Sequence, residues 1–112
     1  TGVKENGAKC SSCHDGSQVD LTICMERSAN SSRNSLSLPA SGTAPTYIGG
    51  SSSATATAAG IAALVWSANT SKTREQVLQC LTSTAQFASA PSSSKGYGNI
   101  NAAAAVNCAL AQ

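Results

Sequence analysis

Residues 52–68 constrain the fold more than any other part of the sequence. Up to Gly60 this stretch carries only small side chains, and Ile61, Leu64 and Val65 then follow at the spacing of a helix face. Small side chains let a helix approach a sheet or another helix closely, and a helix that is apolar on nearly all sides must be buried. We therefore expect a buried helix over residues 52–68 that packs against neighbouring elements.

The rest of the chain predicts short strands and two further helices. Apolar residues recur with a period of two over residues 19–26, which predicts a strand with one buried face. Leu36 and Leu38 indicate another short strand. Residues 73–76 read Thr-Arg-Glu-Gln, a capping box that predicts a second helix. Asn101 is suited to cap a final alanine-rich helix over residues 102–110.

Composition indicates that these elements belong to a larger unit. The chain has 112 residues, only 4% of them aromatic, so little large apolar surface is available to drive folding. Charged residues make up 11% of the chain, where about 25% is usual. Two strands and three helices are too few layers to close a core. The sequence therefore resembles an interior piece of something bigger.

Charge and hydropathy argue against two classes of partner. The net charge is +2 and the seven basic residues are scattered, without the basic patch that nucleic-acid binding needs. The longest mainly apolar stretch, residues 54–66, is too short to cross a bilayer. We expect neither nucleic acid nor membrane as a partner. Because the chain starts at Thr1 with no signal peptide, we expect it to be mature, processed or excised.

Five cysteines in so short a chain indicate an oxidising compartment, so we expect a secreted or periplasmic protein. An odd number leaves one thiol free, bound to metal, or paired with another chain. Cys80 and Cys108 fall on the second and third predicted helices, and a disulfide between them would constrain the last helix. In the N-terminal region, the simplest expectation is a loop clamped by a disulfide from Cys10 or Cys13 to Cys24.

The segment from Cys10 to His14 also fits a competing interpretation. Cys-x-x-Cys-His is the attachment pattern of c-type haem, with Met25 as a candidate sixth ligand. Cys10, Cys13, His14 and Cys24 are likewise plausible zinc ligands. However, cytochromes normally present this motif on a helix, whereas here turn residues surround it. The clamped loop is therefore the favoured interpretation, and a haem or zinc module is the alternative.

The segment at the start of the predicted long helix carries the candidate catalytic residue. Residues 50–54 read Gly-Ser-Ser-Ser-Ala, and Gly60 follows. This resembles the catalytic-serine signature of the subtilisin-like serine proteases, the subtilase family: Gly-Thr-Ser-x-Ala-x-Pro, then Gly and a buried helix. Counting back from Gly60 places the nucleophile at Ser52, with Ser51 in the threonine position. Ala56 replaces the family proline, which alanine can do within a first helical turn.

The resemblance covers about half of the chain. Residues 62–69 are similar to the end of the family's serine helix, residues 73–81 to its next helix, and residues 96–106 to its closing segment. Together these matches extend over about 47–106, and the sequence upstream matches loosely. Residues 1–3 resemble the end of a family strand.

The resemblance implies a fold and a division of the chain. The expected fold is the C-terminal part of an α/β three-layer domain with a mostly parallel sheet, completed by another chain. Residues 1–45 would supply strands and the cysteine-rich loop, and residues 46–112 the nucleophile helix and the C-terminal helices. No cofactor is expected in this chain, and calcium would belong to the complete enzyme.

The resemblance also implies a serine endopeptidase that hydrolyses peptide bonds through an acyl-enzyme. A glycine such as Gly50 before the serine lets substrate approach, and the Ser52 N–H at the helix N-terminus faces the developing oxyanion. The family order is Asp, His, oxyanion Asn and Ser, so the first three lie upstream. His14, the only histidine, has a Cys-His-Asp context unlike the family's Gly-His-Gly. An N-terminal portion of the same protease must then be a separate partner, through autoprocessing or excision.

Overall fold

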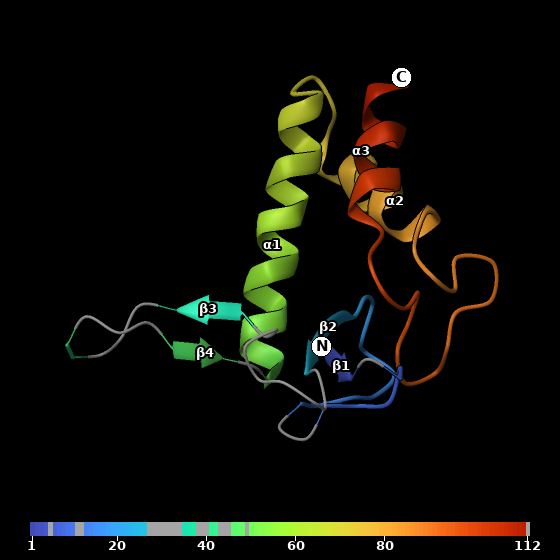
Figure 1. Cartoon of the computed structure of the whole chain (residues 1–112). Coiled ribbons are helices and arrows are strands. Elements are labelled where there is room, and N and C mark those ends of the chain that lie inside the picture. The colour runs from blue at the N-terminus through green and yellow to red at the C-terminus, as the bar shows by residue number, and fades with distance from the viewer. Residues whose placement is uncertain are drawn as a thin grey trace.

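The structure is a computed structural model, and it describes residues 1–4, 6–10, 13–26, 35–37, 41–42, 46–48 and 50–111. Within these ranges, short strands precede three helices (Figure 1). In chain order the elements are β1 (Gly2–Lys4), β2 (Ile23–Glu26), β3 (Ser35–Ser37), β4 (Thr46–Ile48), α1 (Gly50–Ala68), α2 (Arg74–Ser83) and α3 (Ala102–Leu110).

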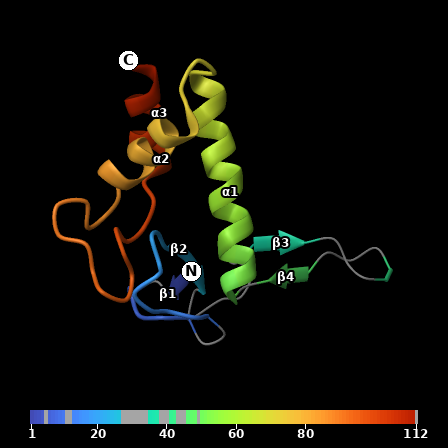
Figure 2. The same cartoon turned by 180° about the vertical axis from the view of Figure 1, so that it is seen from behind.

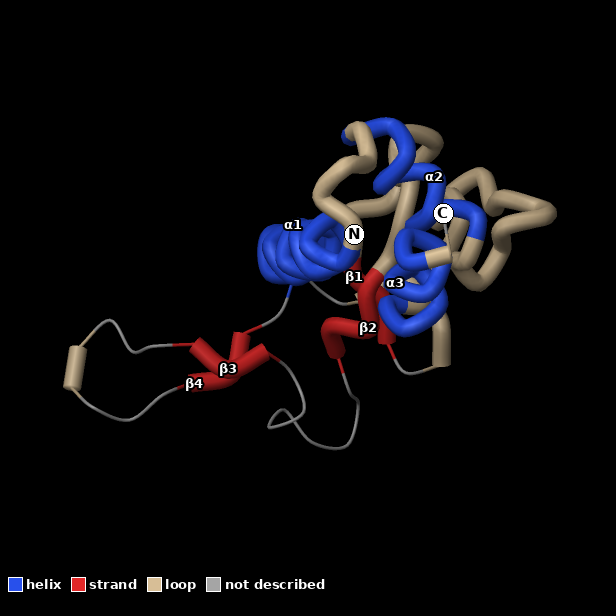
Figure 3. The backbone as a smooth tube through the Cα atoms, turned by 90° about the horizontal axis from the view of Figure 1, so that it is seen from above, coloured by secondary structure: helices blue, strands red, loops and turns tan. Residues whose placement is uncertain are grey.

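The strands form two separate pairs, both near the end of α1 at which this helix begins (Figure 1). β1 pairs with β2 in parallel, and β3 pairs with β4 in antiparallel orientation. Seen along α1, the β1–β2 pair lies on the same side as α2 and α3, and the β3–β4 pair lies on the other (Figure 3). The parallel pair beside α1 is consistent with the expected α/β class. The described strands do not form the mostly parallel sheet of a three-layer domain.

The core lies where the three helices meet, at the end of α1 far from the strands (Figure 2). Its members are small or medium apolar side chains, namely Val65, Val77, Cys80, Leu81, Ala105 and Ala109. The two alanines on α3 are completely buried, because a methyl side chain lets this helix pack closely against α1 and α2.

The expectation that α1 is buried on nearly all sides is wrong for this structure. Leu64 is 55% exposed and Trp66 is 40% exposed, whereas Val65 is completely buried. The described elements cover one side of the helix and leave these two side chains partly exposed. No helix within the described ranges combines the length and apolar content needed to span a bilayer.

β2 is shorter than the strand that the period-two pattern predicts over residues 19–26. β2 begins at Ile23, and Thr22 instead bridges to the segment before α3, accepting from the Ile100 N–H and donating its own N–H to the Gly98 carbonyl (3.1 and 2.9 Å). Residues 19–21 lie outside the strand. β3 lies where the leucines of residues 36–38 indicate a strand, and β4 was not predicted.

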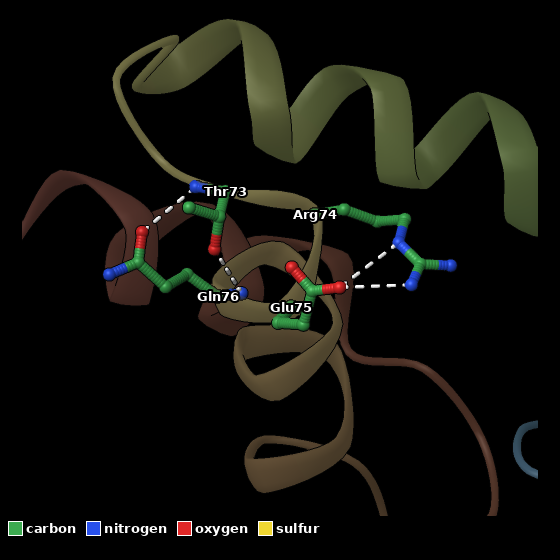
Figure 4. Close-up of polar contacts among 4 residues, drawn as sticks. All are labelled: Thr73, Arg74, Glu75 and Gln76. Carbon is green, nitrogen blue, oxygen red and sulfur yellow. Dashed lines mark hydrogen bonds and ion pairs between the residues drawn. The ribbon is translucent and has the colours of Figure 1, made fainter.

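The predicted caps of α2 and α3 are confirmed. At α2, the Thr73 hydroxyl accepts from the Gln76 N–H (3.2 Å), and the Gln76 side-chain oxygen accepts from the Thr73 N–H (2.8 Å; Figure 4). The Glu75 carboxyl has a pKa below its usual value, first because it accepts from its own backbone N–H and then because Arg74 binds it. Asn101 caps α3 by accepting from the Ala104 N–H (3.0 Å).

We expect Thr73→Ala to lower the free energy of unfolding by about 1 kcal/mol, because the Gln76 N–H loses its acceptor. Thr73→Ser keeps the hydroxyl and should stay within a few tenths of a kcal/mol of the wild type. Urea unfolding followed by circular dichroism measures both variants. Equal losses in the two variants would show that the methyl group of Thr73, rather than its hydroxyl, stabilises this end of α2.

Candidate active site

The N-terminus of α1 carries the predicted nucleophile. The helix begins at Gly50, two residues earlier than predicted, and Gly50 is buried with a φ of 89°. That backbone conformation favours glycine, because a Cβ would collide with the following carbonyl. Ser51 is half-buried and Ser52 is exposed. The Ser52 side chain therefore lies open to solvent on the first turn of α1.

We expect Gly50→Ala to lower the free energy of unfolding by about 1–2 kcal/mol, since alanine disfavours this φ value. Gly60→Ala is the matched control within the same helix. Nothing lies within 4 Å of a Cβ added at Gly60, so this change should stabilise the protein by about 0.5–1 kcal/mol. Thermal unfolding of both variants tests the pair. A neutral Gly50→Ala would contradict the left-handed entry into α1.

Side chains brace the backbone of the first turn. The Thr55 hydroxyl donates to the Ser51 carbonyl and the Thr57 hydroxyl to the Ser53 carbonyl, each at 2.9 Å. Ala54, two residues after the exposed Ser52, is only 1% exposed, so its side of the turn packs against the rest of the protein. The first N–H groups of a helix lack acceptors within it, and the helix dipole makes this end favourable for negative charge. An oxyanion formed at Ser52 would be stabilised here.

Sequence reasoning missed the residues that hold Ser51. The Ser51 hydroxyl accepts from the main-chain N–H of His14 (2.7 Å) and lies 3.0 Å from the Thr1 hydroxyl. The Thr1 hydroxyl in turn donates to the His14 carbonyl oxygen. These three residues are separated by 13 to 50 positions, and no local pattern links them. The structure thus brings the main chain of His14 next to the predicted nucleophile turn.

The cysteine-rich loop differs from the expected pairing. Cys10 and Cys13 form a disulfide with each other, and Cys24 belongs to neither bridge of the structure. The Cys13 N–H also donates to the Cys10 carbonyl (3.1 Å), so the two cysteines lie close together. A Cβ added at Gly2 would meet both Cys13 and Met25, and Cys24 points to the opposite face of β2 from Met25. The predicted bridge to Cys24 is therefore wrong.

This pairing does not support a haem or zinc module. Thioether and zinc sites both need the Cys10 and Cys13 sulfurs, which the disulfide already uses. Among the described residues, no three or more His, Cys, Asp or Glu side chains gather as metal ligands. The loop is instead a closed structural unit whose carbonyls at Cys10 and Cys13 accept from the Lys9 ammonium (3.3 and 2.9 Å).

The second disulfide joins Cys80 on α2 to Cys108 on α3, the pair predicted from the helix positions. Cys80 is buried within the helical core. The bridge therefore fixes α3 against α2 at the end of the molecule far from Ser52.

Comparison with known protein families decides the classification. The model of the subtilase family matches residues 6–99, which is most of the chain and includes the start of α1. The chain belongs to the subtilase family. Subtilases are serine proteases, so the solvent-exposed serine on α1 lies in a protein whose family chemistry uses such a group. No curated protein and no solved structure matches this subtilase chain.

Proposed function

We propose that Ser52 is the nucleophile of a serine endopeptidase and that this chain supplies it to an active site completed by an N-terminal portion of the same protease. The observation that carries the proposal is the exposed Ser52 on the first turn of a 19-residue helix, two residues after Gly50 with its φ of 89°. Membership of the subtilase family supports the same chemistry.

The proposed reaction divides the work between the two parts. The Ser52 oxygen attacks the carbonyl carbon of a peptide bond while a histidine of the N-terminal portion takes its proton. The Ser52 N–H and an asparagine of that portion hold the oxyanion. The histidine then gives the proton to the leaving amine, and water hydrolyses the acyl-enzyme. Peptides or proteins are the substrate, and the chain needs no cofactor of its own, while calcium would bind elsewhere in the complete enzyme.

Two features support the remaining parts of the proposal. Two disulfides among the described residues suit a secreted or periplasmic protein. The exposed Leu64 and Trp66 leave apolar surface on α1 for the N-terminal portion to cover. The separate chains would arise by autoprocessing or by excision.

Reconstitution tests the division of the active site. The chain alone should hydrolyse a chromogenic peptide no faster than buffer, and addition of the N-terminal portion should restore turnover. The same portion with its histidine replaced by alanine is the control and should restore none. Turnover by the chain alone would overturn the proposal that a second portion supplies the catalytic base.

A further inference from the structure

Thr1, His14 and Ser51 form a closed ring of hydrogen bonds whose directions can be assigned. A hydroxyl has a single proton. The Thr1 hydroxyl donates to the His14 carbonyl oxygen, so its contact with Ser51 at 3.0 Å requires Ser51 to be the donor. The Ser51 oxygen accepts from the His14 N–H at 2.7 Å. Each member therefore both donates and accepts within the ring.

We propose that Thr1 is a positioning residue for the nucleophile: with the His14 main chain it fixes Ser51, and through Ser51 it orients the turn that carries Ser52. This inference rests on the proposed function of Ser52. Ser51 is the residue directly before the nucleophile, so a shift of its backbone moves the Ser52 oxygen. Misplacement of a reacting group by about 1 Å can cost about a hundredfold in rate.

Main-chain hydrogen bonds hold Thr1, and a disulfide closes the loop directly before His14. The main chain of Thr1 is tied to the β2 region, since its nitrogen donates to the Leu21 carbonyl and its carbonyl accepts from the Ile23 N–H, both at 3.0 Å. His14 directly follows the loop closed by the Cys10–Cys13 disulfide. Ser51 is thus held between a paired strand and a cross-linked loop.

The ring also allows a positioning role of Ser51 to be distinguished from a direct catalytic role of the same residue. The only hydroxyl proton of Ser51 is directed at Thr1, so it is not available to the oxyanion while the ring is intact. If Ser51 acts through the ring, loss of the Thr1 hydroxyl should impair the enzyme in the same way as loss of the Ser51 hydroxyl. If Ser51 donated to the substrate directly, only its own replacement would lower the rate.

Steady-state kinetics of the assembled protease test the inference. Thr1→Val preserves the shape of the side chain but removes its hydroxyl, and we expect kcat to fall about tenfold to a hundredfold with KM within about twofold. Thr1→Ser retains the hydroxyl and should restore most of kcat. Ser51→Ala should match Thr1→Val, and the double variant should be no worse than either single variant. Circular dichroism checks that each variant is folded.

The outcomes distinguish this inference from the proposed function. Wild-type activity that depends on Ser52, together with an unchanged kcat in folded Thr1→Val, would overturn the positioning role alone. Additive losses in the double variant, or a failure of Thr1→Ser to recover activity, would do the same. If Thr1→Val does not fold, Thr1→Ala takes its place, because it also removes the hydroxyl that donates to His14. The ring predicts that its loss of kcat matches that of Ser51→Ala, and an unchanged kcat in folded Thr1→Ala would overturn the positioning role.

Discussion

Replacement of Ser52 by alanine is expected to lower kcat of the assembled protease by about 10⁴- to 10⁶-fold. The Ser52 hydroxyl on the first turn of α1 is the group that forms the acyl-enzyme in the proposed mechanism, and alanine offers no oxygen in its place. The members of such a catalytic set act as a unit, so the remaining groups retain only the modest rate enhancement that oxyanion binding gives. Hydrolysis of a chromogenic peptide by the reconstituted enzyme measures the loss.

Ser53→Ala is the matched control, because Ser53 is the next residue of the same turn. Its carbonyl, which accepts from Thr57, remains in the alanine variant. We expect kcat of this variant to stay within about threefold of the wild type, since no catalytic step uses the Ser53 hydroxyl. A large loss in Ser53→Ala together with a mild one in Ser52→Ala would place the nucleophile one residue further along α1.

Removal of the Cys80–Cys108 disulfide should have the largest effect on stability. The two cysteines are 28 residues apart, so the chain-entropy model gives a loss of about 3.5 kcal/mol for the double alanine variant. That loss is a large fraction of the about 5–15 kcal/mol by which a domain is usually stable. Urea unfolding of the oxidised wild type and of the variant measures the difference.

The Cys10–Cys13 disulfide offers an internal comparison. Its cysteines are only three residues apart, so the same relation gives a loss of about 2 kcal/mol when both become alanine. The ratio of the two losses tests whether the bridges act mainly by restricting the unfolded chain. A larger loss at Cys10 and Cys13 would show that local packing around Gly2 and Met25 dominates.

The features predicted well from the sequence depend on neighbouring residues. The Thr73–Gln76 capping box and the Asn101 cap each act across three positions, so the residue types alone specify the bonds, and α3 matches its predicted residues. α1 ends at Ala68 as predicted, although it begins at Gly50, two residues before the predicted start at Ser52. The family was recognised from ordered motifs of the same local kind.

The features that were missed depend on contacts between distant residues. The face of β2 that each side chain occupies decides which cysteines meet, and the register with β1 sets that face. The exposure of Leu64 and Trp66 depends on which elements cover α1. The ring of Thr1, His14 and Ser51 joins backbone and hydroxyl groups that nearly every sequence contains, so no pattern of residue types announces it.

The most direct test of the account is the position of a covalent adduct. The assembled protease is treated with a fluorophosphonate, digested, and its modified residue located by tandem mass spectrometry. Attack by the activated nucleophile should place one phosphonyl group on Ser52, at the start of α1. An adduct on another serine, or none on an enzyme that hydrolyses peptides, would contradict the assignment of Ser52 as the nucleophile.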